Sequence, residues 1–213
     1  MSTLGLTPSK NATVLFDGTD LGGWMTRDGR EPGWKVGEGI ATVVAGTGDI
    51  VSREHYEDAY IHLEFRCPDM PDKTGQAKGN SGVYLQARYE IQVLDSYGWE
   101  VPGLGDCGAI YNLHAPIQNA CKPAMEWQTY DIVFRAARCD DAGNVVERGR
   151  VTVIHNGLTI QNNVELQLTG GAMGAGESEP GPLLLQDHGD PVSYRNVWLV
   201  HLPRKGSEQY EPR

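Results

Sequence analysis

The sequence predicts an all-β protein built from two antiparallel sheets packed as a sandwich. Three observations support this fold: short strand-forming runs recur along the chain, clusters of turn residues separate them, and helical periodicity is hard to find. Glycine, at 27 of 213 residues, supplies the tight turns that short-strand folds need. The length fits one domain, since β-sandwiches commonly run to about 200–250 residues.

The predicted strands follow one another from end to end, separated by Gly, Pro, Asn and Asp. Asn156-Gly157 lies between two of them and is a strong hairpin signal. We expect one domain over residues 12–203, with a flexible N-terminal segment at 1–11 and a tail at 204–213. The strands are expected at Ala12–Phe16, Trp34–Val36, Ile40–Val44, Tyr60–Arg66, Ser81–Arg88, Glu90–Leu94, Thr129–Ala136, Val151–His155, Leu158–Ile160, Gly181–Gln186 and Val192–Leu202.

In three of these strands, apolar and polar residues alternate, which assigns them to opposite faces. The polar rows hold residues that hydrogen-bond sugar hydroxyls and stack on sugar rings, although a solvated sheet face explains any single row. Because the rows share one alternation phase, we expect them to converge on a single concave face as a carbohydrate site. The rows are His62, Glu64 and Arg66; Tyr84, Gln86 and Arg88; and Glu90 and Gln92.

The charge and hydropathy of the chain exclude several classes of partner. A net charge of −10 and the lack of a basic stripe argue against binding to nucleic acid. No apolar run approaches the roughly 20 residues of a membrane helix, and residues 1–12 lack the pattern of a signal peptide. We therefore expect a small carbohydrate as the partner, with no nucleic acid and no membrane; the oligomeric state is left open.

Four cysteines are present, and none forms the C-x-x-C pair of a zinc site. Cys107 and Cys121 flank one Gly- and Pro-containing excursion, so we expect a disulfide between them. Cys67 and Cys139 each end a predicted strand and are either bonded across neighbouring strands or free buried thiols. Two disulfides would favour a periplasmic or secreted location, and cytoplasmic is the alternative.

Several motifs, in order along nearly the whole chain, resemble the 3-keto-disaccharide hydrolase domain family, formerly a domain of unknown function. The longest is G-N-S-G-V-Y-L-Q-A-R-Y-E-I-Q-V-L-D-S-Y at Gly79–Tyr97. The resemblance implies a jelly-roll of the concanavalin A and glucanase type with a carbohydrate site in the concave sheet. The other motifs are Leu15–Trp24, Cys107–Tyr111, Glu126–Phe134, His155–Gly157, Leu185–Gly189 and Arg195–Trp198.

The resemblance also implies an activity, the cleavage of glycosides whose sugar is oxidised at C3. Relatives in the wider glucanase clan place two acidic residues two apart on one strand, whereas Gln92 follows Glu90 at that spacing here. A C3 ketone acidifies the C2 hydrogen, so a base can remove it and expel the aglycone, with hydration completing the reaction. We expect Glu90 and His188 to be base and acid, with Glu64 competing for either role.

The expected substrate contacts come from the polar rows and the loops beside them. Asp187 is a candidate to orient His188, while His155 is expected at the end of a hairpin. Trp99, in the excursion at 96–108, is a candidate for stacking on sugar, whereas the other tryptophans are expected to be packing residues. The contacts are Arg66, Tyr84, Gln86, Gln92, Asp95, Tyr97, Trp99, Tyr111 and Gln186.

No motif fixes a cofactor. A divalent cation would suit the chemistry by polarising the ketone, and Glu64, Glu90, Asp95 and His188 are its candidate ligands. A structural calcium in a loop is an equal alternative. A non-catalytic carbohydrate-binding module is the main alternative to an enzyme, followed by a structural or adhesion domain.

Overall fold

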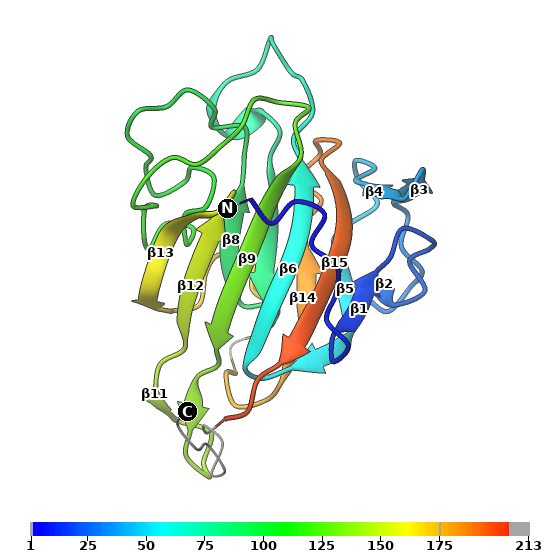
Figure 1. The fold of residues 1–213 in the computed structure, drawn as a ribbon. Coiled ribbons are helices and arrows are strands. Elements are labelled where there is room, and N and C mark those ends of the chain that lie inside the picture. The colour runs from blue at the N-terminus through cyan, green and yellow to red at the C-terminus, as the bar shows by residue number, and fades with distance from the viewer. Residues whose placement is uncertain (1, 175, 205–213) are drawn as a thin grey trace, which may run out of the picture.

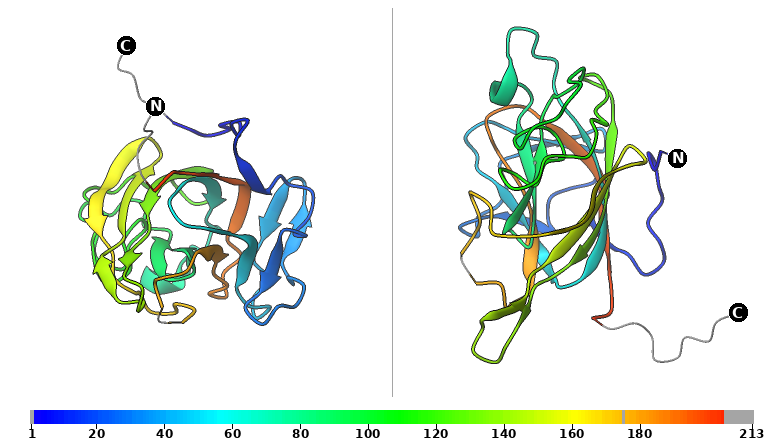
Figure 2. Two further views of the ribbon diagram at one scale, coloured as in Figure 1. Left: turned by 90° about the horizontal axis from the view of Figure 1, so that it is seen from below. Right: turned by 90° about the vertical axis from the view of Figure 1, so that its left-hand side faces the viewer.

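The structure is a computed structural model that describes residues 2–174 and 176–204. Two antiparallel sheets pack face to face, as the prediction required (Figures 1 and 2). The larger sheet has the order β13 (Leu158–Glu165), β12 (Arg150–His155), β9 (Gln128–Arg135), β6 (Ala59–Arg66), β15 (Ser193–His201), β4 (Ile40–Thr42) and β3 (Lys35–Gly37), with β1 (Thr13–Phe16) also paired to β15.

The smaller sheet has five strands in the order β2 (Trp24–Thr26), β5 (Ile50–Tyr56), β14 (Gly181–Leu185), β7 (Ser81–Leu85) and β8 (Tyr89–Val93). A separate pair joins β10 (Arg138–Cys139) to β11 (Val145–Glu147). One short helix of the 3-10 type, η1, spans Gly75–Ala77 within the described residues. No helix in the described ranges is long and apolar enough to cross a membrane.

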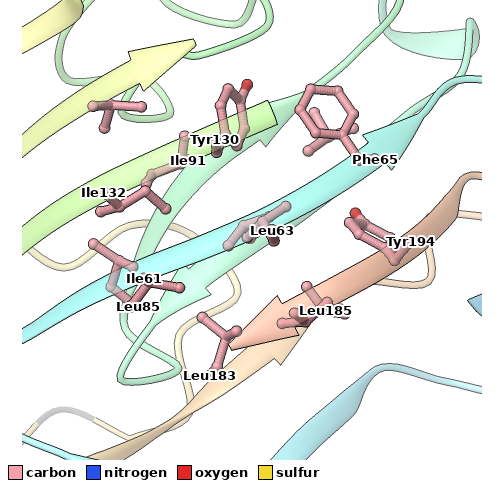
Figure 3. Packing of buried hydrophobic residues seen from close by; sticks show 14 of the residues in the cluster. Ile61, Leu63, Phe65, Leu85, Ile91, Tyr130, Ile132, Leu183, Leu185 and Tyr194 are labelled. Carbon is pink, nitrogen blue, oxygen red and sulfur yellow. The ribbon is translucent and has the colours of Figure 1, made fainter. Parts of the chain in front are cut away.

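The hydrophobic core fills the space between the two sheets (Figure 3). Ile61, Leu63 and Phe65 point into it from β6, as their alternation predicts. Leu85 of β7 and Ile91 of β8 meet them from the other sheet. The polar residues between these positions consequently point to the outside of the sandwich, where a ligand can reach them.

All the predicted strands are present, with their ends shifted by up to five residues. Asn156 and Gly157 join β12 to β13 with φ angles of 52° and 83°, which confirms the predicted hairpin. Strands β2, β5, β10 and β11 were not predicted from the sequence. Strand β5 reads I-V-S-R-E-H-Y, and its four successive polar residues obscure the alternation of a strand that is nevertheless internal to its sheet.

The expected convergence of the polar rows on one face is wrong. Glu64 lies on β6 in the larger sheet, whereas Glu90 lies on β8 in the smaller one. Since both strands point their apolar residues into the shared core, Glu64 and Glu90 face opposite sides of the sandwich. Arg66 lies two residues after Glu64 on the same face of β6, so it also lies away from the expected site.

The predicted strand at 81–88 also ends three residues early. Gln86 and Ala87 have φ angles of 49° and 53°, and they form the turn between β7 and β8 rather than a continuation of β7. The Gln86 amide donates to the Tyr56 carbonyl at 2.7 Å, and the Arg88 guanidinium donates to Gln86 Oε1 at 2.8 Å. These two side chains stabilise the turn and are therefore not part of the predicted polar row.

The N-terminal segment, which was expected to be flexible, crosses the outer face of the larger sheet in front of β9 and β6 (Figure 1). The Gly5 amide donates to Glu64 Oε1 at 2.6 Å, and the Thr3 hydroxyl donates to Asp131. This segment therefore covers the polar residues of that sheet. The predicted tail beyond Arg204 lies outside the described residues.

Candidate functional site

A pocket of about 170 Å³ opens on the outer face of the five-stranded sheet. Strands β7 and β8 form its floor, and the loops around η1, after β8, before β14 and after β14 form its walls. The volume is below the range of pockets for drug-sized ligands, and it suits a single sugar ring. Its lining consists of Gln76, Asn80, Tyr84, Glu90, Gln92, Tyr111, Gly170, Gly171, Gln186 and His188.

Glu90 lies on the floor of the pocket, in cross-strand register with Tyr84. The neighbouring pair is Gly82 and Gln92, and the missing side chain of Gly82 makes room for the carboxyl group. A Cβ atom at Gly82 would lie 2.6 Å from Glu90 Oε1 and 2.9 Å from Tyr84 Cε2, well inside contact distance. Glycine at this position is therefore a requirement of the site's shape.

Burial raises the pKa of the Glu90 carboxyl to about 7. The Tyr84 hydroxyl opposes this shift by hydrogen bonding to the carboxylate, and the negative charge of Asp49 adds to it. Neither group carries the positive charge that would hold Glu90 ionised. A carboxyl group with a pKa near neutrality can both accept and return a proton, which is what acid–base catalysis requires.

Three amide side chains around Glu90 present unpaired oxygens. Asn80 Oδ1, Gln92 Oε1 and Gln186 Oε1 are buried and have no hydrogen-bond partner among the described residues. Their nitrogens are engaged: Asn80 donates to the Gln76 carbonyl at 2.7 Å, and Gln92 donates to Gln76 Oε1 at 3.0 Å. Gln186 donates to the Tyr84 hydroxyl at 3.1 Å.

The consequence is a pocket rich in acceptors. A buried acceptor without a partner costs about 1–3 kcal/mol, and a ligand hydroxyl would remove that cost. The nitrogen contacts also fix which end of each amide is oxygen, since each nitrogen faces an acceptor. The arrangement can therefore bind a molecule that donates several hydrogen bonds from one side, as a sugar does.

His188 and Tyr111 complete the chemically active lining of the pocket. His188 is exposed and follows β14 in a loop, as expected. Asp187 does not orient it, because its carboxylate accepts from the amides of Gly48, at 2.9 Å, and Gly189, at 3.0 Å. The imidazole consequently projects from a loop that these hydrogen bonds hold in place.

Four residues of the site were not predicted from the sequence. Gln76 and Asn80 come from the η1 region, and Gly170 and Gly171 come from the connection before β14. Gly171 has a φ angle of 81°, and a Cβ atom there would lie 2.8 Å from the Tyr84 hydroxyl. Asn80 lies in the longest motif of the chain, but no pattern in the sequence places the other three residues at this sheet.

Several expected contacts lie outside the pocket lining. Asp95 forms a salt bridge with Lys78 at 3.0 Å, and Gln86 belongs to the β7–β8 turn. Tyr97 and Trp99 are more than half exposed in the loop after β8. Arg66 belongs to the larger sheet, away from the pocket, and lies over the Trp127 ring, 4.8 Å from its centroid. The candidate cation ligands are consequently dispersed: Glu90 and His188 share the pocket, whereas Glu64 and Asp95 lie elsewhere.

Glu64 belongs to a polar cluster under the N-terminal segment. Its carboxylate accepts from Arg195 Nε at 2.7 Å and from Asn196 Nδ2 at 3.1 Å, beside the Gly5 amide. His62 lies 3.8 Å away and pairs with Asp131 at 2.8 Å. Although burial opposes ionisation, these donors lower the pKa of Glu64 to about 2. An ionised, fully partnered carboxylate has a structural role here.

The predicted disulfide is absent, since Cys107 and Cys121 are free thiols, as are Cys67 and Cys139. The sulfur atoms of Cys107 and Cys121 nevertheless lie within 4.8 Å of each other. The excursion therefore brings these two residues together without joining them in the structure.

Comparisons with known proteins agree with this architecture. A crystal structure described as a putative glycosyl hydrolase from Parabacteroides distasonis superposes on this chain with a TM-score of 0.83 at 36% identity, covering 91% of this chain and 84% of that one. A second structure with the same description and organism has a TM-score of 0.66 at 22% identity, covering 92% of this chain and 99% of that one. No curated protein matches the chain.

A sequence model described as the 3-keto-alpha-glucoside-1,2-lyase-like domain matches residues 11–200, which is nearly the whole described domain. This is the family that the motifs resemble, and its jelly-roll fold is the one observed. The chain therefore belongs to the 3-keto-alpha-glucoside-1,2-lyase-like family and is glycoside hydrolase-like.

Proposed function

We propose that the protein cleaves glycosides oxidised at C3 of the sugar, by removal of the C2 proton and elimination of the aglycone, followed by hydration. The observation that carries this proposal is the buried Glu90 carboxyl, whose pKa is raised to about 7 in a pocket of hydrogen-bond acceptors. Membership of the family supports the substrate class.

In the first half of the reaction, the Glu90 carboxylate takes the proton from C2. The electron pair of the C2–H bond passes to the C3 ketone oxygen and forms an enolate, for which the Tyr111 hydroxyl is available as a donor. When the enolate collapses, the C1–C2 double bond forms and the bond from C1 to the glycosidic oxygen breaks. His188, protonated at this stage, supplies the proton that the leaving oxygen requires.

Hydration then reverses these bond changes with water in place of the aglycone. Water adds its oxygen to C1 and gives a proton to His188, while Glu90 returns a proton to C2. The sum is one 3-keto-glycoside and one water converted to a 3-keto sugar and the free aglycone, with Glu90 and His188 restored. Asn80, Gln92 and Gln186 would orient the ring by accepting from its remaining hydroxyls.

The composition of the pocket favours this route over ordinary glycoside hydrolysis. Retaining and inverting glycosidases need two carboxyl groups flanking the scissile bond, about 5 Å or 6.5–9.5 Å apart. Among the described residues that line the pocket, Glu90 is the one acidic side chain. The proposed elimination fits this lining, because the C3 ketone acidifies the C2 hydrogen and the reaction then needs no second carboxyl group.

Exchange at C2 tests the proposal directly. A 3-keto-glucoside incubated with the enzyme in deuterated water should release a sugar that carries deuterium at C2, measured by mass spectrometry and NMR. Glu90→Gln should incorporate deuterium no faster than buffer alone, because the glutamine cannot take the proton. Cleavage without enzyme-dependent deuterium at C2 would contradict the proposed elimination.

The same experiment separates an enzyme from a carbohydrate-binding module, which the unpaired amide oxygens would equally serve. A binding module would retain the 3-keto-glucoside in equilibrium dialysis and release no aglycone. An enzyme would release aglycone, and its Glu90→Gln variant would still bind the substrate because the three amide oxygens remain in place.

A further inference from the structure

A second group of chemically active side chains lies outside the pocket, where the long β8–β9 connection meets the end of β12. Cys107 and Cys121 come from that connection, and His155 is the last residue of β12. One ligand atom from each of the three lies within 4.8 Å of the other two. Cys107 and His155 are buried, whereas Cys121 is partly exposed and gives access from solvent.

The hydrogen bonding of His155 leaves one ring nitrogen available. Nε2 lies 2.9 Å from Gln128 Oε1, and the same oxygen accepts from the Lys122 amide at 2.9 Å and from Asn156 Nδ2 at 3.2 Å. An oxygen with these donors around it is an acceptor, so Nε2 carries the proton and Nδ1 keeps a free electron pair.

Nδ1 is buried and has no hydrogen-bond partner among the residues that the structure describes. A carbonyl oxygen behind the protonated nitrogen is the usual outer-shell arrangement of a metal-bound histidine, because it fixes both the tautomer and the orientation of the ring. Two sulfurs and an imidazole in one largely buried cluster are the ligands that Zn²⁺ prefers.

We propose that Cys107, Cys121 and His155 bind one thiophilic divalent cation, of which Zn²⁺ is the natural example, with a water molecule at the fourth position beside Cys121. Zinc–sulfur bonds of about 2.3 Å at tetrahedral angles place two sulfurs about 3.8 Å apart. Ligand atoms already within 4.8 Å need to move by about 1 Å or less. The ligands are far apart in sequence, which is why no spacing motif indicates the site.

A disulfide between the two cysteines is the competing use of the same sulfurs. It would occupy both sulfur atoms and leave the His155 Nδ1 atom buried without a partner among the described residues, which is unfavourable. A metal ion engages all three groups at once. The tertiary arrangement therefore favours the metal.

The proposed metal would fasten the connection that forms one wall of the sugar pocket. Residues 94–127 join β8 to β9, and Tyr111 lies within them. Cys107 Sγ also lies 3.1 Å from the Tyr130 hydroxyl, which donates to the Gln92 carbonyl of β8 at 2.7 Å. A metal at Cys107 would thus restrain both the loop and the strand that carry pocket residues.

Cobalt is a suitable probe, because tetrahedral Co²⁺ bound to thiolates absorbs strongly in the near ultraviolet and the visible. The full chain would be reduced, freed of metal with a chelator and titrated with Co²⁺ without oxygen. We expect one Co²⁺ per chain, both absorption bands, and displacement by one equivalent of Zn²⁺. Cys121→Ser should abolish stoichiometric uptake, and Cys139→Ser is the matched control that should retain it, because Cys139 lies outside the cluster.

Circular dichroism of Cys121→Ser checks that the variant is folded, and the parent protein decides the question by itself if it is not. Absence of stoichiometric Co²⁺ uptake by the reduced parent would overturn the proposal. Uptake by folded Cys121→Ser equal to that of the parent would also overturn it. A Cys107–Cys121 disulfide in protein prepared without reductant, combined with no uptake after reduction, would assign the sulfurs to each other instead.

Discussion

Glu90 and Glu64 lie on the outer faces of the two sheets, and both are almost fully buried, with 4% and 1% of their surfaces exposed. Their carboxyl groups nevertheless have opposite properties. Burial raises the pKa of Glu90 to about 7, whereas Arg195, Asn196, His62 and the Gly5 amide hold that of Glu64 at about 2. Both residues are glutamates that lie on strands and are similarly buried, but only Glu64 has positively charged and hydrogen-bonding partners that compensate its charge.

This difference shows what separates a reactive buried carboxyl from a structural one. Burial alone makes ionisation of a carboxyl group unfavourable. A neighbouring cation and hydrogen bonds normally compensate for this, as they do around Glu64. At Glu90 it provides instead a glycine that makes room, a tyrosine and three amide oxygens without partners. The burial of Glu90 is not compensated by a positive charge, as is typical of a functional carboxyl group in a ligand pocket.

The largest expected effect concerns turnover of a 3-keto-glucoside. Glu90→Gln should lower kcat by about 10²–10⁴-fold, because it removes the general base and keeps the shape of the side chain. Glu64→Gln is the matched control on the other sheet and should leave kcat within about twofold. Initial rates of aglycone release measure both variants. A greater loss in Glu64→Gln than in Glu90→Gln would reverse our assignment of the two faces.

A smaller loss is expected from crowding the Glu90 carboxyl without changing it. Gly82→Ala places a methyl group 2.6 Å from the position of Glu90 Oε1, so the carboxyl must move. A displacement of about 1 Å at a catalytic group costs about 10²-fold in rate. Gly37→Ala, on β3 of the other sheet, meets nothing within 4 Å and is the control. Equal rates for the two alanine variants would show that the carboxyl position is unimportant.

The two glutamates should also affect stability over different pH ranges and with opposite sign. The folded pKa of Glu64 is below its ordinary 4.5, so its contribution is present above pH 4.5 and is lost as the pH falls towards 2. The folded pKa of Glu90 is above 4.5, so its contribution is present below pH 4.5 and is lost as the pH rises through 7.

Urea unfolding of the parent, Glu64→Gln and Glu90→Gln at pH 3, 5 and 8 measures these contributions. The advantage of the parent over Glu64→Gln should shrink between pH 5 and pH 3. Relative to Glu90→Gln, the parent should lose stability between pH 5 and pH 8. Parallel pH dependences in the two variants would mean that the two carboxyl environments are equivalent.

The comparison also shows which parts of the fold the sequence could predict. Alternation correctly placed Ile61, Leu63 and Phe65 in the core and Glu64 on the outer face. Alternation could not show whether Glu64 and Glu90 lie on the same face. A period of two residues separates inside from outside, but it does not say which sheet a strand joins. That choice depends on the pairing of β6 with β9 and β15, which are distant in sequence.

The candidate site was predictable where its residues belong to strands and motifs. Tyr84, Glu90 and Gln92 on β7 and β8 line the pocket as expected, and His188 and Gln186 follow β14. Gln76, Gly170 and Gly171 reach it through loops whose paths no local pattern specifies. The same limit applies to the Cys107, Cys121 and His155 cluster, since His155 could be placed at a hairpin end but not beside the two cysteines.

The most direct test of the contrast between the two faces is the titration of the glutamate carboxyls themselves. Protein labelled with ¹³C at the glutamate carboxyl carbon can be followed by NMR from pH 3 to pH 9 without any substrate. Our account predicts one resonance that titrates near pH 7 and is missing from Glu90→Gln, and another that remains ionised down to pH 3 and is missing from Glu64→Gln. Titration of the Glu90 resonance at or below the ordinary value of 4.5 would contradict the account.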